Sequence, residues 1–346
     1  MKKIISFFII VIFASCKSSD IATENKKAKW ITDAFDAIES GNYPNIKAIS
    51  WWHENWEGTK LRLDSSKEAT ERYKERIAND LYETELIFEN NKLIPNPDGI
   101  YHSAFPDFGG QENFVSDEKI IEFEDLVGKE IAWAYFSNNW IGGIFFPIDD
   151  VQIIHNTGKT PFIRLMARSD FQEYGQDETY TMERIIQGDF DVELNTWFVQ
   201  AANLDYPILC EFGTEVNGSW FPWNGQYSGA GITDAYGDAN YPDGPERFRD
   251  AYRHIIDIAN LNNANNITWF FHIDVNGEPD MNWNTINYYY PGDNYIDWLG
   301  FSAYGPYDTN AEMEYFSELV EQVYPKLQEI STEKPIAVLE FGVTEL

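Results

Sequence analysis

Eight short runs rich in β-branched and aromatic residues recur along this chain, and stretches with helical periodicity separate them. Alternating strand and helix patterns are typical of a parallel sheet covered by helices. The runs span residues 46–52, 101–108, 130–136, 161–166, 206–212, 267–272, 296–303 and 335–341. Eight such strands close naturally through right-handed crossovers, and closure removes the exposed sheet edges. We therefore predict one TIM-type (β/α)8 barrel over residues 26–346.

Apolar stripes predict the positions of several helices between these strands. The clearest stripes are Trp30, Ala34, Phe35 and Ile38; Ala69, Tyr73, Ile77 and Leu81; and Phe248, Tyr252, Ile255, Ile256 and Ala259. A weaker pattern predicts a helix over residues 311–330. An open doubly wound sheet is the alternative fold, but the sequence has no Gly-rich phosphate loop of the Rossmann or Walker kind. No solenoid repeat or low-complexity linker indicates a second domain.

The N-terminus has the pattern of an export signal. Two lysines precede an apolar run over residues 4–13, and small residues come before Cys16. The run is too short to span a bilayer. The Phe-Ala-Ser-Cys sequence resembles a bacterial lipobox, so we expect residues 1–16 to be a lipoprotein signal and residues 17–25 a tether. The expected location is the bacterial cell envelope, with a lipid anchor on Cys16 at the outer membrane or cell surface; simple secretion is the alternative.

The net charge of −32 excludes some partners. Such a charge repels phosphate backbones, so we expect no nucleic-acid partner. A neutral substrate fits better, and aromatic residues make up 16% of the chain, which allows some exposed rings to stack on sugars while most pack the core. Cys210 is the second of two cysteines, so the mature chain has no intrachain disulfide or cysteine-based metal cluster. We expect a monomer.

Two predicted strands deliver carboxylates to the C-terminal end of the barrel, where barrel active sites lie. In the run 206–212 and its continuation, Leu209, Glu211 and Gly213 share a face, and Glu215 joins them if the strand continues. The last strand ends in the same way at Glu340. Glycosidic bond cleavage needs one neutral carboxyl to protonate the leaving oxygen and one ionised carboxylate to attack the anomeric carbon. Different environments hold the pKa values of such a pair apart.

The sequence resembles glycoside hydrolase family 26, a β-mannanase family of retaining TIM barrels. The family's acid/base motif stands here as EVNGSWFPW, residues 215–223, and Glu340 and Tyr304 match its nucleophile and the tyrosine that supports it. The resemblance implies a retaining endo-glycoside hydrolase with Glu215 as acid/base and Glu340 as nucleophile, requiring no metal or organic cofactor. It favours β-mannan as the substrate. β-Xylan and mixed-linkage β-glucan are the alternatives.

Two positions depart from the family pattern. Thr214 stands where the family usually has histidine, and Ser302 stands where it has aspartate. Both positions belong to the catalytic subsite, so they bear on sugar specificity. A surface glycan-binding lipoprotein without turnover, and an inverting enzyme that uses another carboxylate pair, are further alternatives.

The N-terminal part of the barrel is out of the family's order. Residues 43–66 and the helix after them resemble the family's eighth strand and eighth helix. We therefore predict a circular permutation in which helix seven, strand eight and helix eight come first. A truncated tandem protein is the alternative, although an export signal directly before the first helix argues against it. The permutation would place Trp51 and Trp52 beside Glu340, and strand parity favours Trp52 as the stacking floor.

The remaining predictions concern substrate contacts and metals. The candidate substrate-binding residues are Tyr304, Trp220, Trp223, Asn217, Trp51, Trp52, His53 and Trp140. A core position for the tryptophans and a structural role for the histidine are the alternatives. Glu211 is expected to pair with Arg164 inside the barrel. The acidic loop 233–243 matches no EF-hand spacing, so a solvated loop is favoured over a calcium site.

Overall fold

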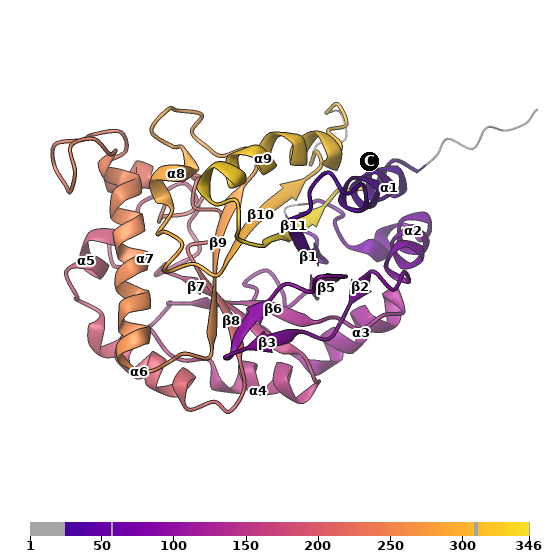
Figure 1. Ribbon diagram of the computed structural model, residues 1–346, viewed down its shortest axis with the longest axis horizontal. Helices are drawn as coiled ribbons and strands as arrows, with labels where there is room; N and C mark the ends of the chain where they lie inside the picture. The colour runs from indigo at the N-terminus through magenta and orange to yellow at the C-terminus, as the bar shows by residue number, and fades with distance from the viewer. Residues whose placement is uncertain (1–24, 57, 308–310, 346) are drawn as a thin grey trace, which may run out of the picture.

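The chain forms a closed ring of parallel strands in a computed structural model that describes residues 25–56, 58–307 and 311–345 (Figure 1). The order around the ring is β1 (Ile46–Trp52), β5 (Ile100–Phe105), β6 (Trp133–Asn139), β7 (Thr160–Met166), β8 (Ile208–Phe212), β9 (Ile267–Asp274), β10 (Trp298–Tyr304) and β11 (Ile336–Gly342). Strand β1 pairs with both β11 and β5, which closes the ring. The predicted TIM-type barrel is confirmed.

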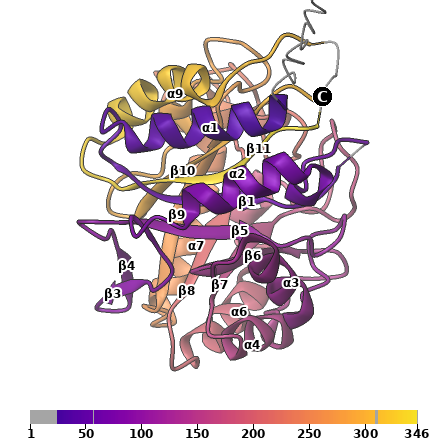
Figure 2. The same cartoon turned by 90° about the vertical axis from the view of Figure 1, so that its right-hand side faces the viewer.

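Helices cover the outside of the ring. They are α1 (Lys26–Glu39), α2 (Lys67–Ile77), α3 (Asp117–Val127), α4 (Ile148–Asn156), α5 (Met182–Ile186), α6 (Asp191–Ala202), α7 (Asp243–Leu261), α8 (Ile286–Tyr289) and α9 (Phe316–Ile330). Helix α1 lies between α9 and α2, so the first and last helices of the described residues are neighbours (Figure 2). The buried faces of the helices include the predicted apolar stripes except Leu81, which lies beyond the end of α2. Among the described residues, no helix combines the length and apolar character that a membrane span requires.

The strand boundaries differ from prediction by a few residues at most sites. Strand β1 has the predicted bounds, whereas β6 begins at Trp133 and ends at Asn139, three residues later than predicted. The cause is local, because the backbone N–H of Ile131 donates to the Glu124 carboxylate at 2.9 Å before ladder pairing begins. The shift brings Ser137 into the strand and, through it, a contact with Glu112.

A short hairpin covers the end of the barrel where the strands begin. It consists of β3 (Ile87–Glu89) and β4 (Lys92–Ile94), and it follows the short strand β2 (Tyr82–Glu83). Leu93 donates its backbone N–H to Thr268 Oγ1 at 2.8 Å and accepts a hydrogen bond from Trp298 Nε1 at 3.0 Å. Sequence patterning did not predict this hairpin. It covers the starts of β9 and β10. The opposite end of the barrel, where the strands end, is not covered by this hairpin.

The barrel interior changes from aromatic to charged along the strands. Near the strand starts, the ring of Trp298 stacks on Phe270 with centroids 5.6 Å apart, and Trp133 packs edge-on against Phe162. One layer further, Arg164 and Glu211 are buried and paired at 3.2 Å. The apolar layers therefore support a polar layer at the C-terminal end of the barrel.

The N-terminal strand lies inside the ring rather than beside it. Strand β1 stands between β11, the last strand of the chain, and β5. The permuted order requires this position. The permutation relative to the family stays a prediction.

Candidate active site

Glu215 lies on a tight turn that follows β8. The strand ends at Phe212 and does not continue to Glu215, so a turn rather than strand parity directs this side chain. Gly213 has φ +65°, and a Cβ there would lie 2.5 Å from the Phe248 ring, so glycine is required. Glu215 itself has φ 47°, a conformation that few non-glycine residues adopt. The turn carries the carboxyl group to the mouth of the barrel, where Glu215 is 8% exposed.

The rest of the motif fixes this carboxyl group. Trp220 Nε1 donates a hydrogen bond to Glu215 Oε2 at 2.7 Å. A Cβ on Gly218 would lie 2.2 Å from the Trp220 ring, so glycine allows the indole to cross the backbone here. Asn217 forms two hydrogen bonds of 2.8 Å with the backbone of Asp274, one as donor and one as acceptor, which ties the turn to β9.

Glu340, near the end of β11, is held by three side chains from other strands. Tyr304 on β10 donates its hydroxyl to Glu340 Oε2 at 2.7 Å, and Tyr135 on β6 donates to Oε1 at 2.8 Å. Arg164 on β7 places Nη2 3.1 Å from Oε1. Two hydroxyl donors and one guanidinium fix the orientation of this carboxyl group.

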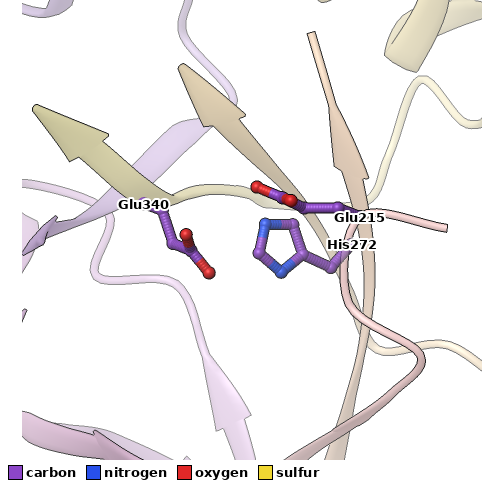
Figure 3. A group of neighbouring side chains, drawn as sticks. All are labelled: Glu215, His272 and Glu340. Carbon is purple, nitrogen blue, oxygen red and sulfur yellow. The ribbon is translucent and has the colours of Figure 1, made fainter. Parts of the chain in front are cut away.

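The carboxyl groups of Glu215 and Glu340 extend toward each other, with the imidazole of His272 beside them (Figure 3). One oxygen of each carboxyl group and one nitrogen of His272 all lie within 4.8 Å of one another. Burial, together with the negative charges of Glu340 and Asp274, raises the pKa of Glu215 well above its usual range. One carboxyl of the pair is therefore arranged to stay protonated beside a carboxylate.

A buried hydrogen-bond network lies under this pair. His272 Nδ1 is 2.9 Å from Glu211 Oε2 and 2.8 Å from Thr214 Oγ1, while its Nε2 is 2.9 Å from Ser302 Oγ. Burial opposes ionisation of Glu211, but His272, Arg164 and Thr214 outweigh it and lower the pKa of that carboxyl. Glu211 is thus an ionised structural partner rather than a second acid.

Arg164 joins the network to the outer loops. Its guanidinium contacts Glu211 at 3.2 Å, Glu340 at 3.1 Å and Glu112 at 2.6 Å, and the residue is 2% exposed. The predicted pairing of Glu211 with Arg164 is confirmed. A buried cation that contacts three carboxylates limits the desolvation cost of the cluster, since none of these charges is left alone.

Metal binding finds little support in these residues. Among the described residues, Glu215, His272 and Glu340 form the one group of three close enough to share an ion. Both ring nitrogens of His272 already have hydrogen-bond partners, so a metal would have to replace one of them. In the acidic loop 233–243, Asp243 accepts the N–H of Ala235, and Glu246 on α7 accepts that of Asp238. These carboxylates therefore accept hydrogen bonds from backbone N–H groups of the loop.

Comparison with known proteins agrees with this geometry. Residues 169–335, which include the Glu215 turn and the strand that carries Tyr304, match the family described as glycosyl hydrolase family 26. The chain belongs to glycosyl hydrolase family 26. It is 32% identical to Endoglucanase H from Acetivibrio thermocellus over 234 residues, which are 67% of this chain and 23% of the relative. It is 26% identical to a beta-1,3-xylanase from Alcaligenes sp over 129 residues, which are 37% of this chain and 23% of the relative.

The chain therefore spans about a quarter of the length of the curated relatives it matches. Among solved structures, it is similar to the GH26 domain of an endo-beta-mannanase/endo-beta-glucanase from Prevotella bryantii. That similarity has a TM-score of 0.47 and 16% identity, and covers 66% of this chain and 73% of the other.

The two departures from the family 26 pattern contact the same histidine. Thr214 binds one ring nitrogen of His272 and Ser302 binds the other. Ser302 also donates a hydrogen bond to Glu215, which lowers the pKa of that carboxyl in opposition to burial. The two substitutions are thus connected to the acid pair through His272 and Ser302.

Three predicted substrate contacts lie at the site. Tyr304 and Trp220 each donate a hydrogen bond to one of the paired carboxyl groups. The ring of Trp52 stacks on Phe105 at 4.1 Å and lies 5.6 Å from the Arg164 guanidinium, so it faces the barrel interior as strand parity indicated. Asn217 positions the Glu215 turn through the backbone of Asp274 instead of facing the carboxylates.

Four predicted contacts are wrong because the side chains pack elsewhere. Trp51 faces the helices and packs against Trp30, Tyr73 and Phe341. Trp223 is fully buried and donates Nε1 to the carbonyl of Thr214. Trp140 is fully buried against Phe212 and Tyr180. His53 accepts the N–H of Leu63 and packs on Phe123 beside α3.

Sequence reasoning missed three residues at the site. Tyr135 contacts both Glu340 and Glu211, and its position two residues after Trp133 on the same strand face was a usable signal. Asp274 follows His272 on its strand in the same way, and burial raises its pKa to about 6. Tyr307 lies beyond the end of β10, where no periodicity predicts an orientation.

Proposed function

We propose that the protein is a retaining, endo-acting hydrolase of a β-linked polysaccharide, with Glu340 as nucleophile and Glu215 as acid/base. One observation carries this proposal: oxygens of the two carboxyl groups lie within 4.8 Å, in surroundings that favour one charged and one neutral group. Retaining glycosidases separate their carboxyl groups by about 5–5.5 Å, whereas inverting enzymes need about 6.5–9.5 Å to admit a water. The spacing therefore supports double displacement.

The reaction follows from the two environments. Glu340, oriented by Tyr135, Tyr304 and Arg164, attacks the anomeric carbon and forms the glycosyl-enzyme bond. Glu215 gives its proton to the glycosidic oxygen as the carbon–oxygen bond breaks. The now ionised Glu215 then takes a proton from water, and the resulting hydroxide nucleophile releases the sugar from Glu340.

We infer that the substrate is a β-glucan, which replaces β-mannan as the leading candidate. The support is the 32% identity with an endoglucanase together with the departures at Thr214 and Ser302. β-Mannan keeps the support of the family resemblance, and β-xylan that of the beta-1,3-xylanase relative. A glycan-binding lipoprotein without turnover would not need the raised pKa of Glu215.

A panel of β-glucan, β-mannan and β-xylan tests the activity, the sugar and the mode of attack together. Wild-type protein should release oligosaccharides of mixed length with retained anomeric configuration, measured by product sizing and NMR. Glu215→Gln and Glu340→Gln should each lower kcat by about 10²–10⁴-fold. Glu118→Gln, at an exposed position on α3, is the matched control. Inverted products, or full activity in Glu340→Gln, would overturn the mechanism, and binding without turnover would leave only the glycan-binding role.

We also propose that the protein is exported and held at the cell envelope by a lipid on Cys16. The support is the signal pattern and lipobox in the sequence, and Cys16 lies outside the described residues. Labelling cells with a clickable palmitate analogue should mark wild-type protein and leave Cys16→Ser unmarked. Equal labelling of both forms would contradict the anchor.

A further inference from the structure

A series of aromatic rings leads from the nucleophile to the protein surface. Tyr304, whose hydroxyl binds Glu340, has its ring centroid 5.7 Å from that of Tyr307. Tyr307 in turn meets Trp56 edge-on, with centroids 6.0 Å apart and an interplanar angle of 66°. Tyr307 is 47% exposed and Trp56 is 43% exposed, although large aromatic rings usually gain stability from burial. The two rings form the outer part of a wall that begins at Glu340.

The hydroxyl of Tyr307 lies near the acid pair. Protein surrounds this residue closely enough that burial, with the charges of Glu215, Asp274 and Glu340, raises the pKa of its hydroxyl well above the usual range. Nearly half of the residue is nevertheless open to solvent. The residue thus has its hydroxyl near the acid pair while part of its side chain stays open to solvent.

The position of Trp56 is fixed from the strand that carries Glu340. Three hydrogen bonds join Trp56 to Thr59: the Trp56 N–H donates to Thr59 Oγ1 at 2.9 Å, and the Trp56 carbonyl accepts from Thr59 Oγ1 at 2.6 Å and from the Thr59 N–H at 2.8 Å. The next residue, Lys60, donates its N–H to Thr344 Oγ1 at 2.8 Å, just beyond β11. The exposed indole is thus held by a closed turn that is bonded to the segment following the nucleophile.

We propose that Trp56 and Tyr307 form a subsite for neutral pyranose units on the glycone side of the cleaved bond, beyond the sugar that reacts. This inference rests on the proposed hydrolase function. Glu340 bonds to the anomeric carbon of the retained sugar, and the aromatic wall extends from Glu340 through Tyr304. Trp220, bonded to the acid/base, lies on the side of the leaving group. Units stacked on Trp56 and Tyr307 therefore belong to the glycone.

The chemistry of the wall selects its ligand. Exposed flat rings offer apolar faces to the C–H faces of pyranoses. Glu215, Asp274 and Glu340 lie near Tyr307, and the whole chain carries a net charge of −32, so acidic sugars are disfavoured. A neutral chain of several units fits both features.

Aryl β-glycosides of one and of three sugar units, made with the sugar that the panel identifies, test the subsite together with the polymer. Trp56→Ala and Tyr307→Ala should lower kcat/KM on the trioside and polymer about three- to tenfold, chiefly by raising KM. In Trp56→Ala the aryl monoside should react as with wild type, because a single sugar unit does not reach this outer ring. The control is Tyr43→Ala, which removes a ring paired with Tyr324 at 5.1 Å before β1, at the opposite end of the barrel.

Each outcome decides for or against the subsite. Equal losses on monoside and trioside in Trp56→Ala, or no loss on either, would overturn it, as would an equal trioside loss in Tyr43→Ala. If wild type cleaves nothing, the hydrolase proposal fails, and electrophoresis in gels containing each polysaccharide still tests the subsite. Retardation of wild type that weakens in Trp56→Ala supports the subsite, whereas equal retardation of both, or none in any gel, rejects it.

Discussion

Glu215 combines two features that are uncommon for a glutamate. Its backbone has positive φ, and its carboxyl group is buried beside another carboxyl group. Both are unfavourable for folding, since strained φ values and unpaired buried acids each cost free energy. Hydrogen bonds from Trp220 and Ser302 partly offset the second cost by stabilising the ionised form. Burial thus raises the pKa of Glu215, and the hydrogen bonds from Trp220 and Ser302 reduce the size of this rise.

Removing the Trp220 donor should move the pH dependence of catalysis. Trp220→Phe deletes the 2.7 Å bond to Glu215 Oε2, and this bond lowers the pKa of Glu215. The pKa should therefore rise, so the basic limb of the kcat/KM profile, which reports the protonated acid in the free enzyme, should move to higher pH. Trp223→Phe is the matched control because its Nε1 contacts the carbonyl of Thr214 instead. A basic limb that stays in place or moves to lower pH would contradict this role.

Helix α1 is fastened to the loop between β1 and α2 through one buried lysine. Lys27 Nζ donates to the carbonyls of Lys60, Leu61 and Arg62 at 2.6, 3.1 and 2.7 Å. The helix ends in the turn that leads to β1, and the loop it binds also contains Thr59, which holds Trp56. One element therefore supports both the ring and the aromatic wall.

Lys27→Met should destabilise the protein by about 1–3 kcal/mol for each carbonyl left buried without a donor. The apolar stem of methionine keeps the packing while removing the ammonium group. Thermal unfolding followed by circular dichroism measures the change, and Lys26→Met, at the exposed neighbouring position, is the control. Equal melting temperatures for the two variants would show that the three hydrogen bonds contribute nothing.

The whole molecule carries buried acids whose protonation couples folding to pH. Burial and the nearby charges of Glu112 and Asp107 raise the pKa of Glu54 from 4.5 to about 8. Between these values the folded chain keeps a proton that the unfolded chain has lost, so folding takes up a proton. The free energy of unfolding should therefore fall as the pH rises from 4.5 to 8.

Urea unfolding at about pH 5 and about pH 8 measures this dependence. Glu54→Gln removes the titrating group, so its unfolding free energy should fall less between the two pH values than that of wild type. Glu85→Gln, at an exposed position, is the matched control. An unchanged difference in Glu54→Gln would show that other groups account for the pH dependence.

We also propose that the order of the barrel strands along the chain is circularly permuted relative to the family. Glu215 follows the fifth ring strand in chain order, and Glu340 lies on the eighth. Moving β1 to the end of the chain would make them the fourth and the seventh. A rearranged gene in which residues 26–77 follow residue 345 through a short linker should fold and act like the original, since α1 already lies against α9. Loss of folding with every linker length would count against the proposal.

The sequence by itself determined the barrel and its two principal carboxyl groups. Strand and helix periodicities are local, so eight runs and their intervening stripes were readable without coordinates. Glu215 was identifiable because its motif contains Gly218 and Trp220, which its own turn requires, and Gly213 stands just before it. Glu340 was identifiable because an apolar strand ends there.

Only the tertiary structure decided which side chains surround that pair. Tryptophan is a residue type that often binds sugars, but Trp51, Trp140 and Trp223 are buried by helices and loops distant in sequence. Tyr135, Arg164 and His272 join the site from three further strands because ring closure brings the ends of β6, β7 and β9 together. The exposure of Trp56 and Tyr307 depends on how two loops meet, and no local pattern encodes such a meeting.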